Sequence, residues 1–427
     1  MNQDLNYYYL IHQEIASLLL YQSIFEDEIG QAFLKLLNSI YNRVPDTINF
    51  NCLTAYSHWF KTLASQGISW QDYLVKRILV DNNPFSQQVQ SDFLSNVPKS
   101  LIEATEHDLS ILNTLYNLPL EAVSQWVKEA AKVPFSPFIV QFENKDNTFL
   151  HKQELWENCL EELANYYRQH GTGIFAQYKA LQWQDNQLMG IANPDPIKLT
   201  EIVGYEAQKA TLIKNTEILL SGYTALHVLL YGSRGSGKSS LVKGLLNQYS
   251  SQGLRLVEVN KSQLYNLPLI VDKLRNVPQK FIIFVDDLSF EEDDDSFKAL
   301  KVVLEGSVTA RAKNVIVYAT SNRRHLIREF FDDRPRPSDA DEIHNWDTVQ
   351  EKLSFSDRFG LTLTFEPANQ ETYLKIVHHL ATEANLNLPP EDLEFRAKQW
   401  ATKHNGRSGR SARQFIDFLQ GELGLKY

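Results

Sequence analysis

Hydrophobic residues in the first part of the chain recur at helical spacing. From Leu5 to about Trp183, segments such as EIASLLLYQSIF (Glu14–Phe25) and LEAVSQWVKEAAK (Leu120–Lys132) place apolar residues three or four positions apart, which is typical of amphipathic helices. Polar or proline-bearing breaks, such as DNNPFSQQ at Asp81–Gln88, separate these segments. We therefore predict an α-helical N-terminal domain over residues 1–189, in which no motif carries recognisable chemistry.

The pattern changes after a turn-rich linker, GIANPDPIKL, at residues 190–199. Short apolar runs then alternate with helical segments, and this alternation predicts βαβ units and a parallel sheet. The expected strands are Ala225–Tyr231, Leu254–Val259, Phe281–Asp286, Asn314–Thr320 and Leu361–Phe365. Three helices are expected from Gln370 onward. We predict an α/β core over residues 200–367 and a small helical lid over residues 368–427.

The composition is that of an ordinary soluble protein. Of 427 residues, 43% are hydrophobic and 22% charged, and apolar runs such as FIIFV at Phe281–Val285 are too short to span a bilayer. The start of the chain lacks the basic region and cleavage site of a signal peptide. The two cysteines, Cys52 and Cys159, have no CxxC spacing, so neither a disulfide framework nor a zinc site is indicated. We expect a cytoplasmic protein that does not associate with membranes.

Charge is unevenly distributed along the chain. Residues 1–195 hold 12 of the 42 Lys and Arg residues and 22 of the 52 Asp and Glu residues, which leaves 30 of each in the remainder. The whole net charge of −10 therefore lies in the first part, which is a poor platform for nucleic acid. The basic stretch TKHNGRSGRSAR (Thr402–Arg413) and the pair Arg323 and Arg324 could bind nucleic acid, but we favour nucleotide sensing and pairing between subunits for them.

A phosphate-binding loop is the clearest motif. YGSRGSGKSS (Tyr231–Ser240) matches G-x-x-x-x-G-K-S between an expected strand and a helical segment, the context that distinguishes the motif from a chance match. The helix N-terminus there offers backbone N–H groups and a positive dipole end to a polyphosphate. We expect Lys238 to reach the β- and γ-phosphates of ATP and the Ser239 hydroxyl to bind Mg²⁺. The expected phosphate-contacting residues are Gly232, Ser233, Arg234, Gly235, Ser236, Gly237, Lys238, Ser239 and Ser240.

Two further expected strands end in polar residues. FIIFVDDLS (Phe281–Ser289) ends an apolar run with two carboxylates. We predict that Asp286 holds Mg²⁺, because hard cations take oxygen ligands, and that Asp287 orients the attacking water as a general base. NVIVYATSN (Asn314–Asn322) ends in Asn322, which could bond the γ-phosphate or the water, or cap the following helix, since Asn is a favoured N-cap. Both roles can hold at once.

With these motifs, residues 200–427 resemble the AAA+ class of P-loop ATPases. The resemblance implies an α/β three-layer P-loop NTPase core with a parallel sheet and a small helical lid, here preceded by the α-helical N-terminal domain. It also implies ATP and Mg²⁺ as ligands. TEIVGYEAQ (Thr200–Gln208) resembles the entry segment whose backbone lines the adenine pocket in that class, which implies contacts from Ile202 and Val203.

Two arginine-bearing segments extend the resemblance. EKLSFSDRFGLTLTF (Glu351–Phe365) resembles the segment that supplies an arginine finger to the neighbouring subunit, here Arg358, which implies a homo-oligomeric ring of unknown size or at least a dimer. A guanidinium there stabilises transition-state charge on the γ-phosphate. NGRSGRSARQF (Asn405–Phe415) resembles the start of the lid helix that carries the second sensor arginine. Arg413 is the better match to this sensor arginine, and Arg410 is the alternative.

Four segments together are similar to the bacterial family catalogued as domain of unknown function 815. They are LLYGSRGSGKSSL, VDDLSFEE, VYATSNRRHLI and DEIHNWDTVQEKLSFSDRFGLTLTF. That family is an AAA+ ATPase module behind a helical N-terminal region and has no established substrate. Many AAA+ proteins have glutamate where this chain has Asp287, and the shorter side chain predicts slow turnover. The DD pair resembles that of replication-initiator and helicase-loader ATPases, which tend to act as slow switches.

Three functions are compatible with these features. The favoured one is a hydrolase that turns over ATP slowly at an intersubunit site and remodels or grips a macromolecular partner chosen by the helical domain. The second is a nucleotide-dependent switch or adaptor, similar to a helicase loader, with little intrinsic turnover. The third is an ATPase that binds nucleic acid, which is possible but not favoured. The segment 332–342 is expected to be a flexible, solvated connector, and a substrate-contacting loop is the alternative.

Overall fold

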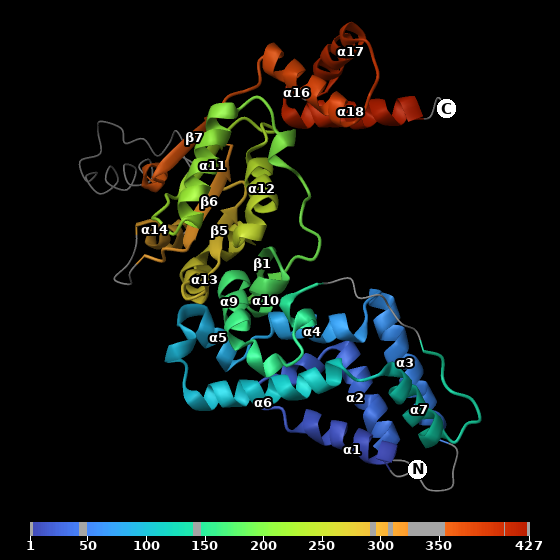
Figure 1. The fold of residues 1–427 in the computed structure, drawn as a ribbon. Helices are drawn as coiled ribbons and strands as arrows, with labels where there is room; N and C mark the ends of the chain where they lie inside the picture. The colour runs from blue at the N-terminus through green and yellow to red at the C-terminus, as the bar shows by residue number, and fades with distance from the viewer. Residues whose placement is uncertain are drawn as a thin grey trace. The chain divides into compact units, whose positions relative to one another are not determined.

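The computed structural model contains two compact units, Met1–Gln177 and Tyr178–Tyr427 (Figure 1). The residues that the structure describes are 3–41, 49–139, 147–290, 296–305, 311–322, 355–404 and 406–424. The division between the units differs from the sequence-based boundaries, which extended the helical domain to residue 189 and a linker to residue 199.

A β-hairpin accounts for this difference. β1 (Ala180–Gln184) and β2 (Gln187–Gly190) pair antiparallel, and β1 also pairs with a strand of the second unit's sheet. Asp185 and Asn186 connect the two strands with φ angles of 50° and 61°. Left-handed backbone at both central residues is what a two-residue hairpin turn requires, and Asp and Asn tolerate it better than most residues. Residues 180–190 are therefore part of the sheet and not of the helical domain.

Within its described residues the first unit is helical, as its apolar periodicity predicts. Its α-helices are α1 (Gln3–Ala16), α2 (Glu28–Tyr41), α3 (Phe50–Gln66), α4 (Trp70–Val80), α5 (Pro84–Ser91), α6 (Lys99–Tyr116), α7 (Leu120–Ala131), α8 (Phe149–Lys152), α9 (Leu160–His170) and α10 (Gly173–Gln177). Short 3₁₀ turns occur at η1 (Gln22–Phe25), η2 (Leu94–Asn96) and η3 (Trp156–Asn158). The buried core includes the rings of Phe33, Trp59 and Trp70, whose centroids lie 4.3 to 5.5 Å apart.

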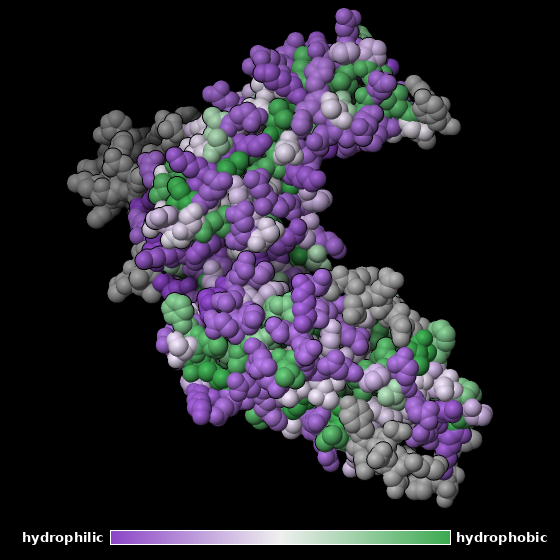
Figure 2. Space-filling model, in the orientation of Figure 1, coloured by the Kyte–Doolittle hydropathy of each residue, from purple (hydrophilic) through white to green (hydrophobic). Residues whose placement is uncertain are grey.

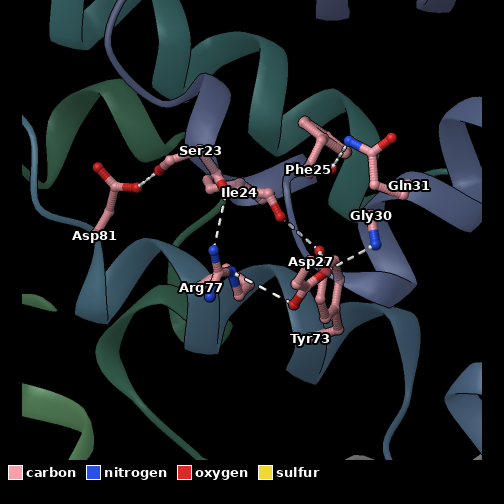
Figure 3. Close-up of polar contacts among 9 residues, drawn as sticks. All are labelled: Ser23, Ile24, Phe25, Asp27, Gly30, Gln31, Tyr73, Arg77 and Asp81. Carbon is pink, nitrogen blue, oxygen red and sulfur yellow. Dashed lines mark hydrogen bonds and ion pairs between the residues drawn. The ribbon is translucent and has the colours of Figure 1, made fainter. Parts of the chain in front are cut away.

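A polar cluster ties the turn η1 to helix α4 in this unit (Figure 3). The Tyr73 hydroxyl oxygen lies 2.7 Å from Asp27 Oδ1 and 2.5 Å from the carbonyl oxygen of Ile24. Arg77 donates to the carbonyl oxygen of Ser23 at 2.8 Å. Burial, assisted by the Asp27 carboxylate, raises the pKa of Tyr73, so its hydroxyl stays protonated as a donor. These groups bond one another and the backbone, so the cluster supports the turn.

The second unit is built on a seven-stranded sheet in the order β2-β1-β4-β5-β6-β3-β7. After the hairpin its strands are β3 (Val228–Gly232), β4 (Leu254–Glu258), β5 (Lys280–Val285), β6 (Val315–Ser321) and β7 (Leu361–Phe365). All neighbours except β1 and β2 pair in parallel. These five strands are the ones that the apolar runs predict, so the parallel sheet is confirmed.

Helices cover both faces of this sheet, which confirms the three-layer α/β core (Figure 1). α11 (Glu206–Leu220) and α12 (Lys238–Tyr249) share one hydrophobic cluster with the strands, and α13 (Leu267–Leu274) packs against α14 (Ser296–Glu305). Along the sheet, the connection from β3 to β4 runs in one direction, and the connections from β4 to β5 and from β5 to β6 run in the other direction. Because such connections are right-handed, α12 lies on one face of the sheet and α13 and α14 lie on the other face. Ligands of such sheets bind at the carboxyl ends of the strands, where the order reverses.

Three helices, α16 (Gln370–Glu383), α17 (Pro390–Lys403) and α18 (Gly409–Gly424), form the lid around a hydrophobic cluster of their own. Asn369 caps α16 by accepting the backbone N–H of Thr372 at 2.8 Å. In the described ranges of the chain, no helix is both long and apolar enough to cross a bilayer.

Candidate functional site

The phosphate loop follows β3 directly and leads into α12. Gly232, Gly235 and Gly237 have φ angles of 138°, 73° and 87°, a backbone region in which other residues are strained. Gly237 is the N-cap of α12, whose first helical residue is Lys238. No described side chain caps this helix, so its first N–H groups can bind phosphate oxygens.

The base of the loop is locked to the neighbouring strand β7. A Cβ atom at Gly232 would lie 2.0 Å from the carbonyl oxygen of Phe365. The same oxygen accepts the N–H of Ser233 at 2.9 Å. Only glycine permits this close approach, so the sequence of the motif fixes where the loop leaves the sheet.

Lys238 is largely buried beneath the loop, with 6% of its surface exposed. Its Nζ donates to the carbonyl oxygens of Gly232 at 3.0 Å and Ser233 at 2.7 Å, and lies 3.4 Å from Oδ1 of Asn322. Burial lowers the pKa of Lys238, while the carboxylates of Asp286 and Asp287 oppose that shift. The ammonium is thus held by weak neutral acceptors, which a phosphate oxygen can replace.

At the end of β5, Asp286 receives several hydrogen bonds on one oxygen. Ser239 donates its hydroxyl proton to Asp286 Oδ1 at 2.7 Å, and Thr320 on β6 donates to the same atom. The backbone N–H of Asp287 lies 3.2 Å from it. Because Ser239 gives its proton to the carboxylate, the hydroxyl lone pairs stay available, and a hydroxyl beside a carboxylate is an oxygen donor set that fits Mg²⁺.

Asp287 has a left-handed backbone, with φ of 51°, which is uncommon for a residue with a side chain. Its N–H donates to the Thr320 hydroxyl oxygen at 2.9 Å, and its Oδ1 accepts the Asn322 amide at 2.6 Å. Strained backbone of this kind clusters at functional sites, where surrounding contacts hold it.

Asn322 links Asp287 to Lys238, because its amide group donates to Asp287 and its Oδ1 lies near the Lys238 ammonium. Its alternative role, as cap of a following helix, falls on residues outside the described ranges.

A cavity of about 610 Å³, within the usual range for small-molecule sites, lies among the loop, the strand ends and the lid. The expected site residues that line it are Ile202, Val203, Arg234, Gly235, Ser236, Gly237, Lys238, Ser239, Ser240, Asp286, Asp287, Asn322, Arg413 and the alternative Arg410. Its wall also includes Ile197, Glu201, Thr320, Ile376, Leu380, Gly409 and Gln414. Gly232 and Ser233 lie instead at the base of the loop.

The entry segment and the lid supply the apolar part of this wall. Val203 packs against the hydrophobic cluster of the lid that contains Ile376 and Leu380, and Ile202 is 8% exposed. Val203 is far in sequence from the residues of that cluster, so this packing depends on the tertiary position of the lid. The two residues expected near the adenine are thus in a setting that suits an apolar ring.

The sequence analysis did not select Thr320 and Glu201, two lining residues that hydrogen-bond other residues of the site. Thr320 is a polar residue within the apolar strand VIVYATS and is 2% exposed. Buried hydroxyls need partners, so its position two residues before Asn322 could have marked it. Glu201 precedes the expected adenine-contacting residues, and its Oε2 accepts a hydrogen bond from Arg413 at 2.9 Å. No local pattern marks that pairing.

Arg358 lies apart from the cavity of its own chain. It ends the 3₁₀ turn η8 (Phe355–Arg358) and forms an ion pair with Glu305 at the end of α14. Its side chain is 18% exposed. The expected roles of Arg323, Arg324 and the segment 332–342 fall outside the described residues.

The fold and the strand-end site define a P-loop nucleotide-binding protein of the AAA+ class. A helical region precedes the α/β core, as the resemblance implies. The chain belongs to the family described as protein of unknown function (DUF815), whose model matches residues 176–423.

Comparison with solved structures finds RuvB proteins of Thermotoga maritima. One RuvB mutant is 15% identical, with 54% of this chain and 67% of that chain covered and a TM-score of 0.38. The RuvB Holliday junction branch migration motor is 14% identical, with 52% and 72% covered and a TM-score of 0.32. No curated protein matches the chain.

Proposed function

We propose that the protein is an ATPase that hydrolyses ATP to ADP and phosphate. The observation that carries the proposal is the hydrogen bond from Ser239 of the phosphate loop to Asp286 at the end of β5. It joins a phosphate-binding loop to an acid pair at one end of a parallel sheet, which is the arrangement that phosphoryl transfer requires. Asn322 supports the same conclusion, since it contacts both Asp287 and Lys238.

Each polar residue has a role in this reaction. Lys238 and the N–H groups of the loop bind the phosphates. Asp287 accepts a proton from a water molecule, whose oxygen forms a bond to the γ-phosphorus while the bond from that phosphorus to the bridging oxygen of ADP breaks. Asn322 orients Asp287 and the water. Ser239 and Asp286 would hold Mg²⁺, which when bound neutralises charge on the β- and γ-phosphates.

We further propose that the site is completed by a second copy of the chain. Arg358 does not line the cavity of its own chain, and its guanidinium is held by Glu305. In a ring it would exchange that carboxylate for the γ-phosphate of a neighbour, which stabilises the transition state. Arg413 would contact the γ-phosphate of its own chain from the lid.

ATP turnover per subunit, measured over a range of protein concentrations, tests both proposals, with Lys238→Ala as the blank. We expect turnover that rises with concentration and falls at least about tenfold in Arg358→Ala. Turnover independent of concentration and unaffected by Arg358→Ala would contradict the shared site. Turnover no higher than that of the blank at any protein concentration would contradict the ATPase itself.

A slow switch is the second candidate, and the short contact of Asp287 with Asn322 favours it. The Asp287 side chain is one methylene shorter than the glutamate that many AAA+ proteins use, and it is also engaged by Asn322. Both features reduce the contact of its carboxylate with the attacking water molecule. Under this proposal, wild-type turnover stays below about 1 s⁻¹. Asp287→Glu is expected to raise it severalfold, and unchanged turnover in that variant would show that the side-chain length is not limiting.

We propose that the N-terminal unit selects a protein partner in the cytoplasm. Figure 2 shows apolar patches on its otherwise polar surface, and Phe93 and Phe138 are 72% and 79% exposed. Contiguous apolar patches on a protein surface commonly mark contacts with a partner. Its acidic charge argues against nucleic acid as that partner. Both cysteines, Cys52 and Cys159, are buried free thiols, which suits a reducing compartment.

A further inference from the structure

Among the described residues, two hydrogen bonds join the start of the lid helix α18 to the core of the site. The backbone N–H of Arg410, in the first turn of α18, donates to the carbonyl oxygen of Gly235 in the phosphate loop at 3.2 Å. One helical turn later, Arg413 Nη2 donates to Glu201 Oε2 at 2.9 Å. The first contact uses backbone groups, whereas the second joins two charged side chains that both line the cavity.

Glu201 is held from the core side of this contact. It ends the short turn η4 (Leu199–Glu201), and its other carboxylate oxygen, Oε1, accepts the backbone N–H of Lys198 at 3.1 Å. Its side chain is 19% exposed, against 44% for Arg413. The carboxylate is therefore the better-anchored partner, and the arginine on the lid is the one that can change its contact.

An acid in the wall of a cavity for a polyanion needs an explanation. A carboxylate beside the γ-phosphate of ATP would raise the energy of the bound state, because like charges repel strongly where water is partly excluded. A guanidinium binds carboxylate and phosphate oxygens with the same donors. Glu201 and a γ-phosphate are thus competitors for Arg413.

We propose that Glu201 is a positioning residue that occupies Arg413 until a nucleoside triphosphate displaces it. ADP has no γ-phosphate, so with ADP the Arg413–Glu201 pair persists and joins the lid to the core. With ATP, Arg413 moves to the phosphate and the pair opens. Glu201 thereby makes the lid contact depend on the third phosphate. This inference rests on the proposed nucleotide site.

The test uses the full chain and measures the Kd of ADP and of a non-hydrolysable ATP analogue by calorimetry. In Glu201→Gln the competitor loses its charge, so we expect the analogue to bind about five- to tenfold more tightly. The Kd of ADP is expected to change less than about twofold. In an Arg413→Ala background the same substitution is expected to shift the Kd of the analogue less than it does with Arg413 present, because only the direct repulsion by Glu201 remains.

Glu422→Gln is the matched control. Glu422 lies 3.7 Å from Arg396 in an ion pair within the lid, and it lies outside the cavity lining. It is expected to leave both Kd values unchanged. Equal shifts for both nucleotides in Glu201→Gln, weaker binding of the analogue, or no shift would each overturn the role of Glu201. Wild-type protein that binds neither nucleotide would instead refute the proposed function.

Discussion

The two walls of the nucleotide cavity are built in different ways. On the core side, Lys238, Thr320 and Asn322 are joined to the acid pair by a continuous set of hydrogen bonds, and Lys238 and Thr320 are almost fully buried. On the lid side, the charged contact is the pair of Arg413 and Glu201, with the arginine 44% exposed. The core wall is held together by hydrogen bonds within the core, whereas the lid wall depends on a partly exposed ion pair that can exchange its contacts.

The difference follows from the cost of leaving polar groups unpaired. A buried donor or acceptor without a partner costs about 1–3 kcal/mol, so the buried core groups lock one another into a single arrangement. An exposed ion pair contributes only about 0–1 kcal/mol, since water competes for both charges. Losing a partner therefore costs little in the exposed pair on the lid side and more at the buried Thr320 hydroxyl on the core side.

Removing the carboxylate charge of Asp286 is expected to have the largest effect on the core wall. In Asp286→Asn, ATP turnover should fall by about 100-fold or more, because the oxygen set expected to hold Mg²⁺ loses its charge. Steady-state turnover measures this, and calorimetry with and without Mg²⁺ should show that Mg²⁺ no longer strengthens binding. Asp272→Asn, at an exposed ion pair on α13, is the control. Turnover within a factor of two of wild type would exclude Asp286 from the site.

Thr320 should rank next, because one hydroxyl bonds both acids. Thr320→Val keeps the shape but removes the donor to Asp286 and the acceptor for the Asp287 N–H, and we expect turnover to fall by about 10- to 100-fold. Thr320→Ser restores the hydroxyl and should recover most of it. Thermal unfolding of both variants separates a loss of positioning from a loss of folding. If valine and serine behave alike, the hydroxyl is not what matters.

Acid should destabilise the core through His227. This residue is 5% exposed, its Nδ1 accepts the Val317 N–H at 2.9 Å, and burial, with a smaller contribution from Arg311, lowers its pKa to about 3. The unfolded chain takes up a proton near pH 6.5 and the folded chain does not. The stability is therefore complete above pH 6.5 and decreases toward pH 3, by up to about 1.4 kcal/mol per pH unit.

Denaturant unfolding between pH 7.5 and 5, compared with His227→Asn, measures this contribution. The variant is expected to lose the His227 part of the slope while keeping an acceptor for the backbone. Identical slopes in the two proteins would show that the pKa of His227 does not differ between the folded and the unfolded chain.

The smallest effect is expected on the lid side. Arg413→Ala, in protein without nucleotide, should change the free energy of unfolding by less than about 1 kcal/mol, because the pair it removes is partly exposed. Thermal unfolding of the nucleotide-free protein is the measurement. A loss of several kcal/mol would mean that the lid wall is as rigidly built as the core wall, and the contrast between the two would fail.

Local motifs were enough to identify most of the core wall. Lys238 and Ser239 belong to one contiguous loop, and Asp286 and Asn322 end apolar strands whose alternation predicts a parallel sheet. Thr320 and Glu201 were missed because their partners are distant in the chain. Thr320 bonds Asp286 across 34 positions, and Glu201 bonds Arg413 across 212.

The predicted end of the N-terminal domain, at residue 189, differs from the observed division after Gln177 for a related reason. The residues before the linker are apolar enough to continue the helical pattern, and only the pairing of β1 and β2 reveals them as strands. Asp185 and Asn186 were the local sign of a hairpin, and they are a weaker sign than a turn with glycine.

The sequence by itself determined the class of fold, the phosphate loop and the order of the polar strand ends, because short-range patterns encode strands, helices and backbone conformation. The tertiary structure alone decided which acids share a hydroxyl, which carboxylate holds the lid arginine and where Arg358 rests. Those pairings depend on how separate elements pack in space. Short-range patterns in a single sequence do not show which distant residues come into contact.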